Sequence, residues 1–82
     1  MIIVTVAIPV MEVDYDFQID EDVPMWIVRN EIADMICRRN QFEMKGDTRE
    51  LFCWDKRRRI LLDMSRTAYE NGLETGSELV IA

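Results

Sequence analysis

Residues 1–20 contain two stretches with a period of two, in which the bulky apolar side chains fall on one side. Residues 2–8 place aliphatic side chains on one side of an extended strand: Ile2, Val4, Val6 and Ile8. Residues 13–20 alternate more strictly, with Val13, Tyr15, Phe17 and Ile19 set between Asp14, Asp16, Gln18 and Asp20. This alternation is typical of strands with one buried face. The short break between the two stretches predicts an antiparallel hairpin whose apolar sides face the core.

The segment from Val23 to Arg39 has the period of a helix instead. At about 100° per residue, most of its apolar residues fall in one stripe: Met25, Val28, Ile32, Met35 and Ile36. Acidic residues precede the segment and Arg38 and Arg39 end it, which complements the helix dipole. We therefore expect one helix over about residues 23–39 that buries this stripe.

The other apolar residues of this helix lie outside the stripe. Trp26, Ala33 and Cys37 are about 100° from it, and Ile27 points almost directly away. The simplest interpretation is that Trp26 leans over the helix flank. If they are exposed, Trp26 and Ile27 would form a secondary helix patch that could serve a homodimer as well as a foreign partner.

Residues 49–54, with the sequence RELFCW, predict a short strand that is apolar in both phases. If Leu51 and Cys53 face inward, then Phe52 and Trp54 face outward. The opposite register buries both aromatic residues, and the alternation alone leaves the two registers open.

Short elements and turns surround this strand. Asn40 suits a left-handed position after the helix, and residues 41–47 predict a loop from which Phe42 or Met44 could fold back onto the core. The remaining segments are a charged turn at 55–59, a return strand at 60–62, a connection at 64–73 with one helical turn opening at Thr67, a turn at 74–77 and a last strand at 78–82 with Leu79 and Ile81 inward.

Length and composition restrict the possible functions. With 82 residues, of which 49% are apolar, the chain is expected to form a single domain, 1–82, around a modest core. The formal net charge of −6 argues against nucleic acid as a general partner, because phosphate binding needs a basic surface. No basic leader precedes the first strand, and no apolar run approaches the roughly 20 residues that cross a bilayer. We expect a cytoplasmic protein without membrane insertion.

Candidate catalytic and metal-binding residues are few. The sequence has no histidine, which is the commonest general base and a frequent metal ligand. Cys37 and Cys53 do not have a metal or redox spacing, and we interpret them as reduced thiols that pack as small apolar residues. The acidic residues between Asp14 and Asp22 lack the glycine and the terminal glutamate of a calcium loop. We expect no enzymatic activity, no metal and no cofactor.

The order of these elements is hairpin, helix, strand, short strand, turn and strand. A right-handed crossover through the helix is expected to place the next strand beside the first. The prediction is an α+β fold of the β-grasp type, a mixed four- to five-stranded sheet packed on one helix. The last third carries a family resemblance, because RTAYENGL at 66–73 followed by TGSELVI at 75–81 resembles the ending of ubiquitin-like domains. Within that superfamily the chain is similar to the bacterial YukD or EsaB proteins, which are accessory components of type VII (WXG-type) secretion systems.

This resemblance implies a non-conjugating, ubiquitin-like adaptor that binds protein, including membrane components of a secretion machine. Conjugated ubiquitin-like proteins and sulfur carriers end in a flexible Gly-Gly tail, whereas residues 79–82 lie within the last predicted strand. Conjugation and sulfur carriage are therefore not expected. The alternative is a modifier or sulfur carrier whose Gly-Gly tail is missing from these 82 residues.

Two further surfaces are candidates for binding. With Leu51 and Cys53 inward, a protein-binding patch would form on the sheet from Ile3, Phe52, Trp54 and Val80. The resemblance places Phe52 where ubiquitin-like domains have the central aliphatic residue of their recognition surface. The basic turn consists of Lys56, Arg57, Arg58 and Arg59. We interpret it as a solvated turn at the polar rim of that patch, and the alternative is a site for anionic lipid or nucleic acid.

Overall fold

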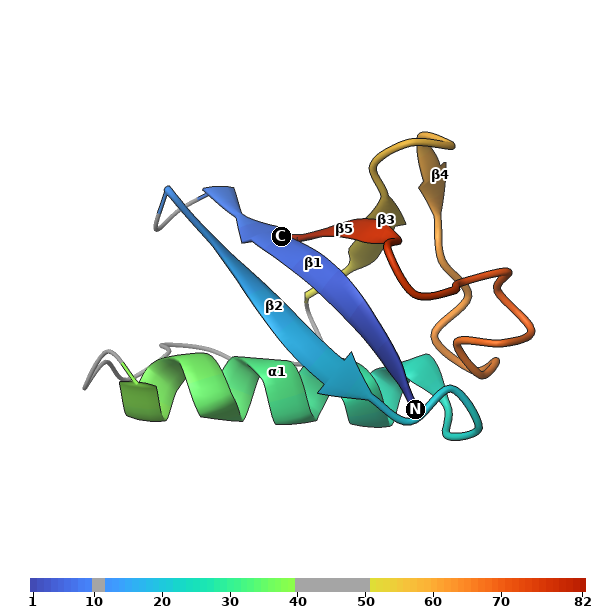
Figure 1. Ribbon diagram of the computed structural model, residues 1–82, viewed down its shortest axis with the longest axis horizontal. Helices are drawn as coiled ribbons and strands as arrows, with labels where there is room; N and C mark the ends of the chain where they lie inside the picture. Colours follow the sequence, from blue (N-terminus) through green and yellow to red (C-terminus); the bar gives the residue numbers. More distant parts are fainter. Residues whose placement is uncertain (10–11, 40–50) are drawn as a thin grey trace.

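The computed structural model describes residues 1–9, 12–39 and 51–82. Within these residues, one helix packs across one face of a five-stranded sheet (Figure 1). The elements in chain order are β1 (Ile2–Ile8), β2 (Val13–Ile19), α1 (Met25–Arg39), β3 (Cys53–Asp55), β4 (Ile60–Leu61) and β5 (Glu78–Ile81). The strands lie in the order β2-β1-β5-β3-β4. The predicted α+β, β-grasp fold is confirmed.

The amino-terminal hairpin has the predicted register. β1 and β2 are antiparallel, with Ile2 opposite Ile19 and Ile8 opposite Val13. Residues directly opposite each other share a face of the sheet, so the apolar sets of both strands point together toward the helix. Val4 and Val6 are almost fully buried there. The alternation in the sequence therefore identified the inner face correctly.

The order of the later strands differs from the prediction. The strand after the helix, β3, does not lie beside β1, since β5 occupies that place and runs parallel to β1. β3 pairs with the other side of β5 and is antiparallel to it. The physical reason lies in the composition of β5: Leu79 and Ile81 are buried and Val80 is half-buried, so this strand is apolar on both faces. An apolar strand at an exposed edge favours aggregation, and a central place avoids this.

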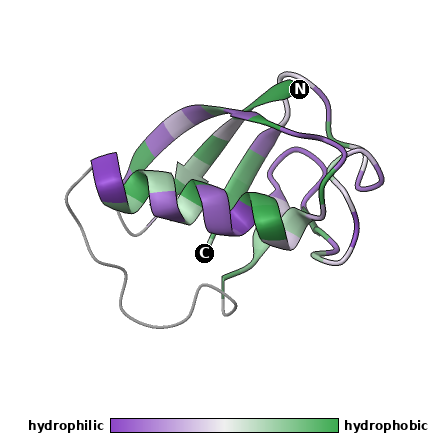
Figure 2. Cartoon of the chain, turned by 90° about the horizontal axis from the view of Figure 1, so that it is seen from below, coloured by the Kyte–Doolittle hydropathy of each residue, from purple (hydrophilic) through white to green (hydrophobic). Residues whose placement is uncertain are grey.

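The helix buries a face that is rotated from the predicted stripe. Met25, Val28, Ile32 and Ile36 are buried as expected, but Met35 is 42% exposed. Ala33, which was expected outside the stripe, is only 4% exposed. The helix also begins at Met25, two residues after the predicted start, and it ends at Arg39 as predicted. Viewed from below, hydrophilic and hydrophobic segments alternate along the helix, which lies in front of the sheet (Figure 2).

A buried arginine accounts for this rotation. Arg29 is 5% exposed although it carries a charge. Its Nε donates to Oδ1 of Asn30 at 3.2 Å, and its guanidinium donates to the carbonyl oxygen of Leu51 at 3.3 Å. A buried charged group has to be hydrogen-bonded. Because these acceptors satisfy Arg29, the side of the helix that carries Arg29 and Ala33 can face the core. Met35 lies on the adjacent side and is therefore exposed.

The connection between β4 and β5 contains the single turn predicted to open at Thr67. The Glu70 N–H donates to Thr67 Oγ1 at 3.0 Å, and the Thr67 N–H donates to a carboxylate oxygen of Glu70 at 3.1 Å. This reciprocal pair is a capping box. The Asn71 N–H then donates to the Thr67 carbonyl oxygen at 3.0 Å, which closes one turn. Ala68 and Leu73 are buried beside it and seal this end of the core.

Some predictions concern residues outside the described ranges. They are the left-handed position at Asn40, the loop at 41–47 with Phe42 and Met44, and the first two residues of the strand predicted at 49–54. Within 51–82, the return strand is confirmed as β4 and the last strand as β5.

Candidate functional site

The structure resolves the register of the segment before the basic turn. Cys53 is fully buried and Leu51 packs against the core, whereas Phe52 is 47% exposed. Phe52 continues the ladder beyond β3: its N–H donates to the carbonyl oxygen of Ala82 at 2.8 Å, and the Ala82 N–H donates back at 3.1 Å. Phe52 and Trp54 therefore point away from the helix, on the outer face of the sheet.

A row of apolar residues crosses four strands on this outer face. Trp54 of β3 lies opposite Leu61 of β4 and also opposite Val80 of β5. Val80 in turn lies opposite Ala7 of β1. Leu61 is 54% exposed, and it was not among the predicted residues of the patch, because the facing of a two-residue strand depends on its partner. We define the sheet patch as Phe52, Trp54, Leu61 and Val80.

The two aromatic residues of the sheet patch contact each other. The ring centroids of Phe52 and Trp54 are 6.1 Å apart with an interplanar angle of 63°, which is an edge-to-face arrangement. Such a contact restricts both rings before any partner binds. Because fewer rotamers would be lost on binding, the pair costs less entropy than two independent side chains.

Ile3 does not belong to this patch, contrary to the prediction. Ile3 is 51% exposed on the same face, but it lies four residues from Ala7 along β1. At roughly 3.3 Å per residue, about 13 Å separates the two rows. The row between them is polar and contains Thr5 opposite both Asp16 and Glu78. Ile3 is thus a separate apolar position at the other end of the face.

The basic turn beside the sheet patch is organised by Asp55. This residue is 5% exposed, and its Oδ1 accepts hydrogen bonds from the backbone N–H groups of Arg57 and Arg58, both at 3.0 Å. Its Oδ2 accepts from Nε of Arg58 at 2.7 Å. Burial opposes ionisation of the carboxyl group, but the hydrogen bonds and the charge of Arg58 outweigh it and lower the pKa of Asp55.

Arg58 is a structural residue, so the prediction of a wholly solvated turn is wrong there. Beyond its pair with Asp55, its guanidinium donates to the carbonyl oxygen of Asn71 at 2.6 Å. Arg57 lies 3.6 Å from a carboxylate oxygen of Glu78. Among the described residues, the side chains of Lys56 and Arg59 have no ion pair or hydrogen bond. Only these two cations remain for an anionic lipid or nucleic acid, which weakens that alternative.

The secondary helix patch is smaller than predicted. Trp26 is 47% exposed, but Ile27 is half-buried and does not point directly away from the core. The backbone N–H of Trp26 donates to the carbonyl oxygen of Met64 at 3.1 Å, so the connection after β4 runs close to this turn of the helix. Trp26 lies on the helix layer, and the sheet separates it from the sheet patch.

The cysteines lie where packing predicted them. Cys53 is buried in the sheet, and its burial raises the pKa of its thiol to about 12 although the charge of Arg29 acts in the opposite direction. Cys37 is half-buried on the helix flank. In the part of the chain that the structure describes, no three Cys, Asp or Glu residues are grouped to hold a metal ion. None of its helices is long and apolar enough to cross a membrane.

Solved structures similar to this chain include ubiquitin-like domains. The ubiquitin-like domain of an Arabidopsis thaliana protein matches over 99% of this chain and 74% of its own length, with a TM-score of 0.73 and 20% identity. The fold is ubiquitin-like. A second structure of that domain gives a TM-score of 0.72 at 20% identity over 99% of this chain and 83% of its own.

The N-terminal ubiquitin-like domain of the 4931431F19Rik protein has a TM-score of 0.75 and 15% identity, over 99% of this chain and 72% of its own. No protein-family model matches the sequence, and no curated protein matches it either. At these identities the similarity establishes the ubiquitin-like fold alone.

Proposed function

We propose that this chain is a ubiquitin-like adaptor that binds a protein partner through the sheet patch and acts without catalysis. The observation that carries the proposal is the exposure of Phe52 beside Trp54, Leu61 and Val80 on the face opposite the helix. Contiguous apolar residues with aromatic members at the centre are typical of protein interfaces. A ubiquitin-like fold is consistent with such a role.

The surroundings of the sheet patch support a docking surface with a defined orientation. Lys56 and Arg59 have side chains free for a partner at one border, and the polar row with Thr5 and Glu78 runs along the same border, since the Lys56 N–H donates to the Glu78 carbonyl oxygen at 2.8 Å. A partner with an apolar centre and polar or acidic residues on this one side would match the patch. A charged border on one side only fixes the register of docking more than it adds affinity.

We propose further that the adaptor is a cytosolic accessory of a type VII (WXG-type) secretion system. The support is the resemblance of the segments at 66–73 and 75–81 to the ending of ubiquitin-like domains, together with the similarity in length to YukD and EsaB within that superfamily. The partner would then be a membrane component of the secretion machine. This part of the proposal rests on likeness, since one fold serves many functions.

The genes flanking the coding sequence provide the first test. A gene for a small WXG-type helical protein together with one for a membrane ATPase of the FtsK kind would support the secretion role. An activating enzyme or a deubiquitinase-like protease in their place would contradict it. That result would favour the alternative of a modifier or sulfur carrier, and the coding sequence after Ala82 would then be read for Gly-Gly.

Binding provides the second test. The purified cytosolic domain of the neighbouring ATPase is titrated with the full chain and with two alanine variants, Phe52→Ala and Ile3→Ala. The two residues have similar exposure, 47% and 51%, but only Phe52 belongs to the sheet patch. Loss of a central interface aromatic costs about 2 kcal/mol or more, so Phe52→Ala should weaken binding about 30-fold or more.

Ile3→Ala is the matched control and should bind like the wild type. Equal loss in both variants would show that the face as a whole, and not the sheet patch, is recognised. A folded Phe52→Ala variant with wild-type affinity would exclude the sheet patch as the docking surface. Thermal unfolding of both variants is measured in parallel to exclude a folding defect.

A further inference from the structure

The outer edge of β2 is unpaired in the part of the chain that the structure describes. β2 lies at one end of the strand order, and its only described neighbour is β1. It is seven residues long, whereas β4 at the opposite edge has two. An edge of this length presents a row of backbone donors and acceptors that can pair with another strand.

The hydrogen bonds of β1 show which backbone groups of β2 face outward. The Thr5 N–H donates to the Ser77 carbonyl oxygen at 3.0 Å, and the Gly76 N–H donates to the Ile3 carbonyl oxygen at 2.9 Å. The odd-numbered residues of β1 therefore bond toward β5 and the even-numbered ones toward β2. Val4 and Val6 lie opposite Phe17 and Tyr15. The N–H and C=O groups left for the free edge belong to Asp14, Asp16 and Gln18.

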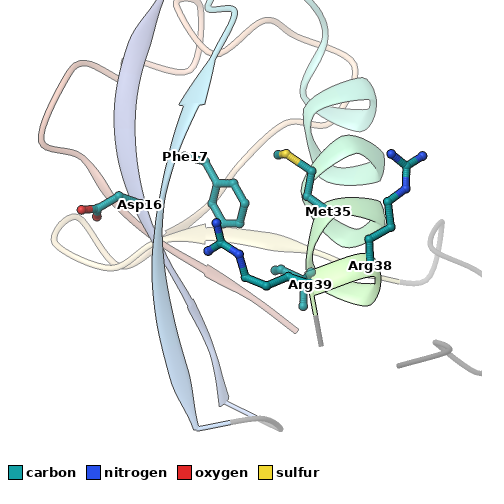
Figure 3. A pocket seen from close by; sticks show the side chains of 6 residues that line it. Asp16, Phe17, Met35, Arg38 and Arg39 are labelled. Carbon is teal, nitrogen blue, oxygen red and sulfur yellow. The ribbon is translucent and has the colours of Figure 1, made fainter. Parts of the chain in front are cut away.

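A hollow adjoins this edge on the helix side. It has a volume of about 440 Å³ between β2 and the last turns of the helix. Phe17 and Met35 extend into it from opposite sides, whereas Asp16 points to the other face of the strand (Figure 3). Arg39 reaches across it from the end of the helix, where its guanidinium lies 5.0 Å from the ring centroid of Tyr15, whereas the guanidinium of Arg38 pairs with Asp34.

Edge and hollow together define what a bound strand would look like. Its residues opposite Asp14 and Asp16 would place their side chains on the outer face, next to these carboxylates. Its alternate residues would point to the helix side, where Phe17 and Met35 offer apolar contacts. Asp16 accepts a hydrogen bond from Thr5 Oγ1 at 2.7 Å, and among the described residues neither Asp14 nor Asp16 forms an ion pair. Basic side chains would complement them.

A second copy of this chain does not match these requirements. Antiparallel pairing of β2 with its own copy, centred on Asp16, would place one Asp16 directly opposite the other. Like charges in directly opposite positions destabilise a strand pair. The net charge of −6 on each copy adds to the repulsion. The charge pattern thus disfavours a homodimer through this edge.

We propose that the β2 edge binds an extended segment of a partner protein in which apolar residues alternate with basic ones. The backbone groups of Asp14, Asp16 and Gln18 supply the strand pairing, and Phe17 and Met35 hold the apolar side chains. This surface is separate from the sheet patch. An adaptor with both surfaces could bridge two partners, but the inference stands without the sheet patch.

The test uses the full chain, isotopically labelled for NMR, and two blocked synthetic peptides as long as β2. One alternates valine with lysine and the other alternates valine with glutamate. The lysine peptide should shift the amide signals of Asp14, Asp16 and Gln18 and slow their hydrogen exchange. The glutamate peptide should bind about tenfold more weakly, because two or three cross-strand charge pairs change from attractive to repulsive.

Variants separate this mode from the alternatives. Exchange of both carboxylates, Asp14→Lys with Asp16→Lys, should reverse the preference between the two peptides. Met35→Ala should weaken binding of the lysine peptide several-fold. Trp26 is similarly exposed but lies at the other end of the helix, so Trp26→Ala should leave this binding unchanged. Phe52→Ala should also leave peptide binding unchanged, so failure of this inference and failure of the sheet patch are distinguishable.

Three results would overturn the inference. The first is equal affinity for the two peptides. The second is a shift of the amide signals of Phe52 and Trp54 without any shift of those of β2. The third is no binding of either peptide to the folded protein at millimolar concentration.

Discussion

Asp55 and Arg58 form a closed ion pair within the basic turn, with Nε of Arg58 2.7 Å from Oδ2 of Asp55. The carboxylate is buried, and it also accepts two backbone N–H groups from the turn it precedes. One acidic residue therefore fixes the path of a segment that contains four successive cations. The guanidinium of the same arginine also donates to the carbonyl oxygen of Asn71 at 2.6 Å, which ties the turn to the connection before β5.

Removal of this carboxylate should destabilise the domain. Asp55→Ala loses three hydrogen bonds, one of them charge-assisted, and should lower the free energy of unfolding by about 2–3 kcal/mol. Asp55→Asn keeps an acceptor for the backbone groups and should cost about 1 kcal/mol. Urea unfolding of both variants measures the difference. Equal stability of Asp55→Ala and wild type would contradict the structural role.

Stability should fall in acid for the same reason. The pKa of Asp55 is lowered in the folded state, and so is that of Asp63, whose carboxylate accepts hydrogen bonds from Ser65. The unfolded chain, with carboxyl pKa values near ~3.9, then binds more protons than the folded chain, so stability increases with pH. The contribution is complete above the unfolded pKa and is lost as pH falls through the folded values. Urea unfolding at successive pH values should show a decline below about pH 4, shallower in Asp55→Asn.

The two cysteines should differ in reactivity. Cys53 is fully buried with a pKa raised to about 12, so almost none of it is thiolate near neutral pH. Cys37 is half-buried on the helix and accessible in part. Iodoacetamide at pH 8 should therefore label Cys37 in the folded protein and both residues in denaturant, as followed by peptide mass spectrometry. Labelling of Cys53 at the rate of Cys37 without denaturant would show that the sheet opens locally.

Local patterns predicted the elements of this fold well. The inner face of β2 follows from strict alternation, those of β1 and β5 follow from the side that carries their larger aliphatic residues, and the end of the helix follows from Arg38 and Arg39. The order of strands did not follow, because a pairing such as Ala7 with Val80 joins distant parts of the chain. The rule of right-handed crossovers was applied to the strand directly after the helix. Nothing in the local patterns indicated that the last strand, β5, would lie beside β1 instead.

The candidate site was predicted only in part, for similar reasons. Phe52 and Trp54 were assigned to one of two open registers, and the burial of Cys53 decides between them. Ile3 was included because it shares their face, and only the register of β1 with β5 shows the polar row in between. The exposure of Met35 depends on a carbonyl group of Leu51 that accepts from Arg29, which helical periodicity does not contain.

Gly72 provides a test of how firmly the basic turn is anchored. Gly72 and Gly76 both have positive φ angles, +78° and +95°, so alanine at either position should cost about 1 kcal/mol of backbone strain. At Gly72 a Cβ atom would also lie 2.8 Å from a guanidinium nitrogen of Arg58, whereas Gly76 has open space. A free arginine end would move aside at little cost, but this one is held by Asp55 and Asn71.

Gly72→Ala should therefore destabilise the domain more than Gly76→Ala, by about 0.5–1 kcal/mol for the displaced hydrogen bonds. The excess should disappear when both glycine variants are made in an Arg58→Ala background, since the obstructing group is then absent. A double-mutant cycle by urea unfolding isolates this coupling between Gly72 and Arg58. Equal costs at the two glycines in the wild-type background would mean that Arg58 is not anchored and that its guanidinium is available to a partner, as for Lys56 and Arg59.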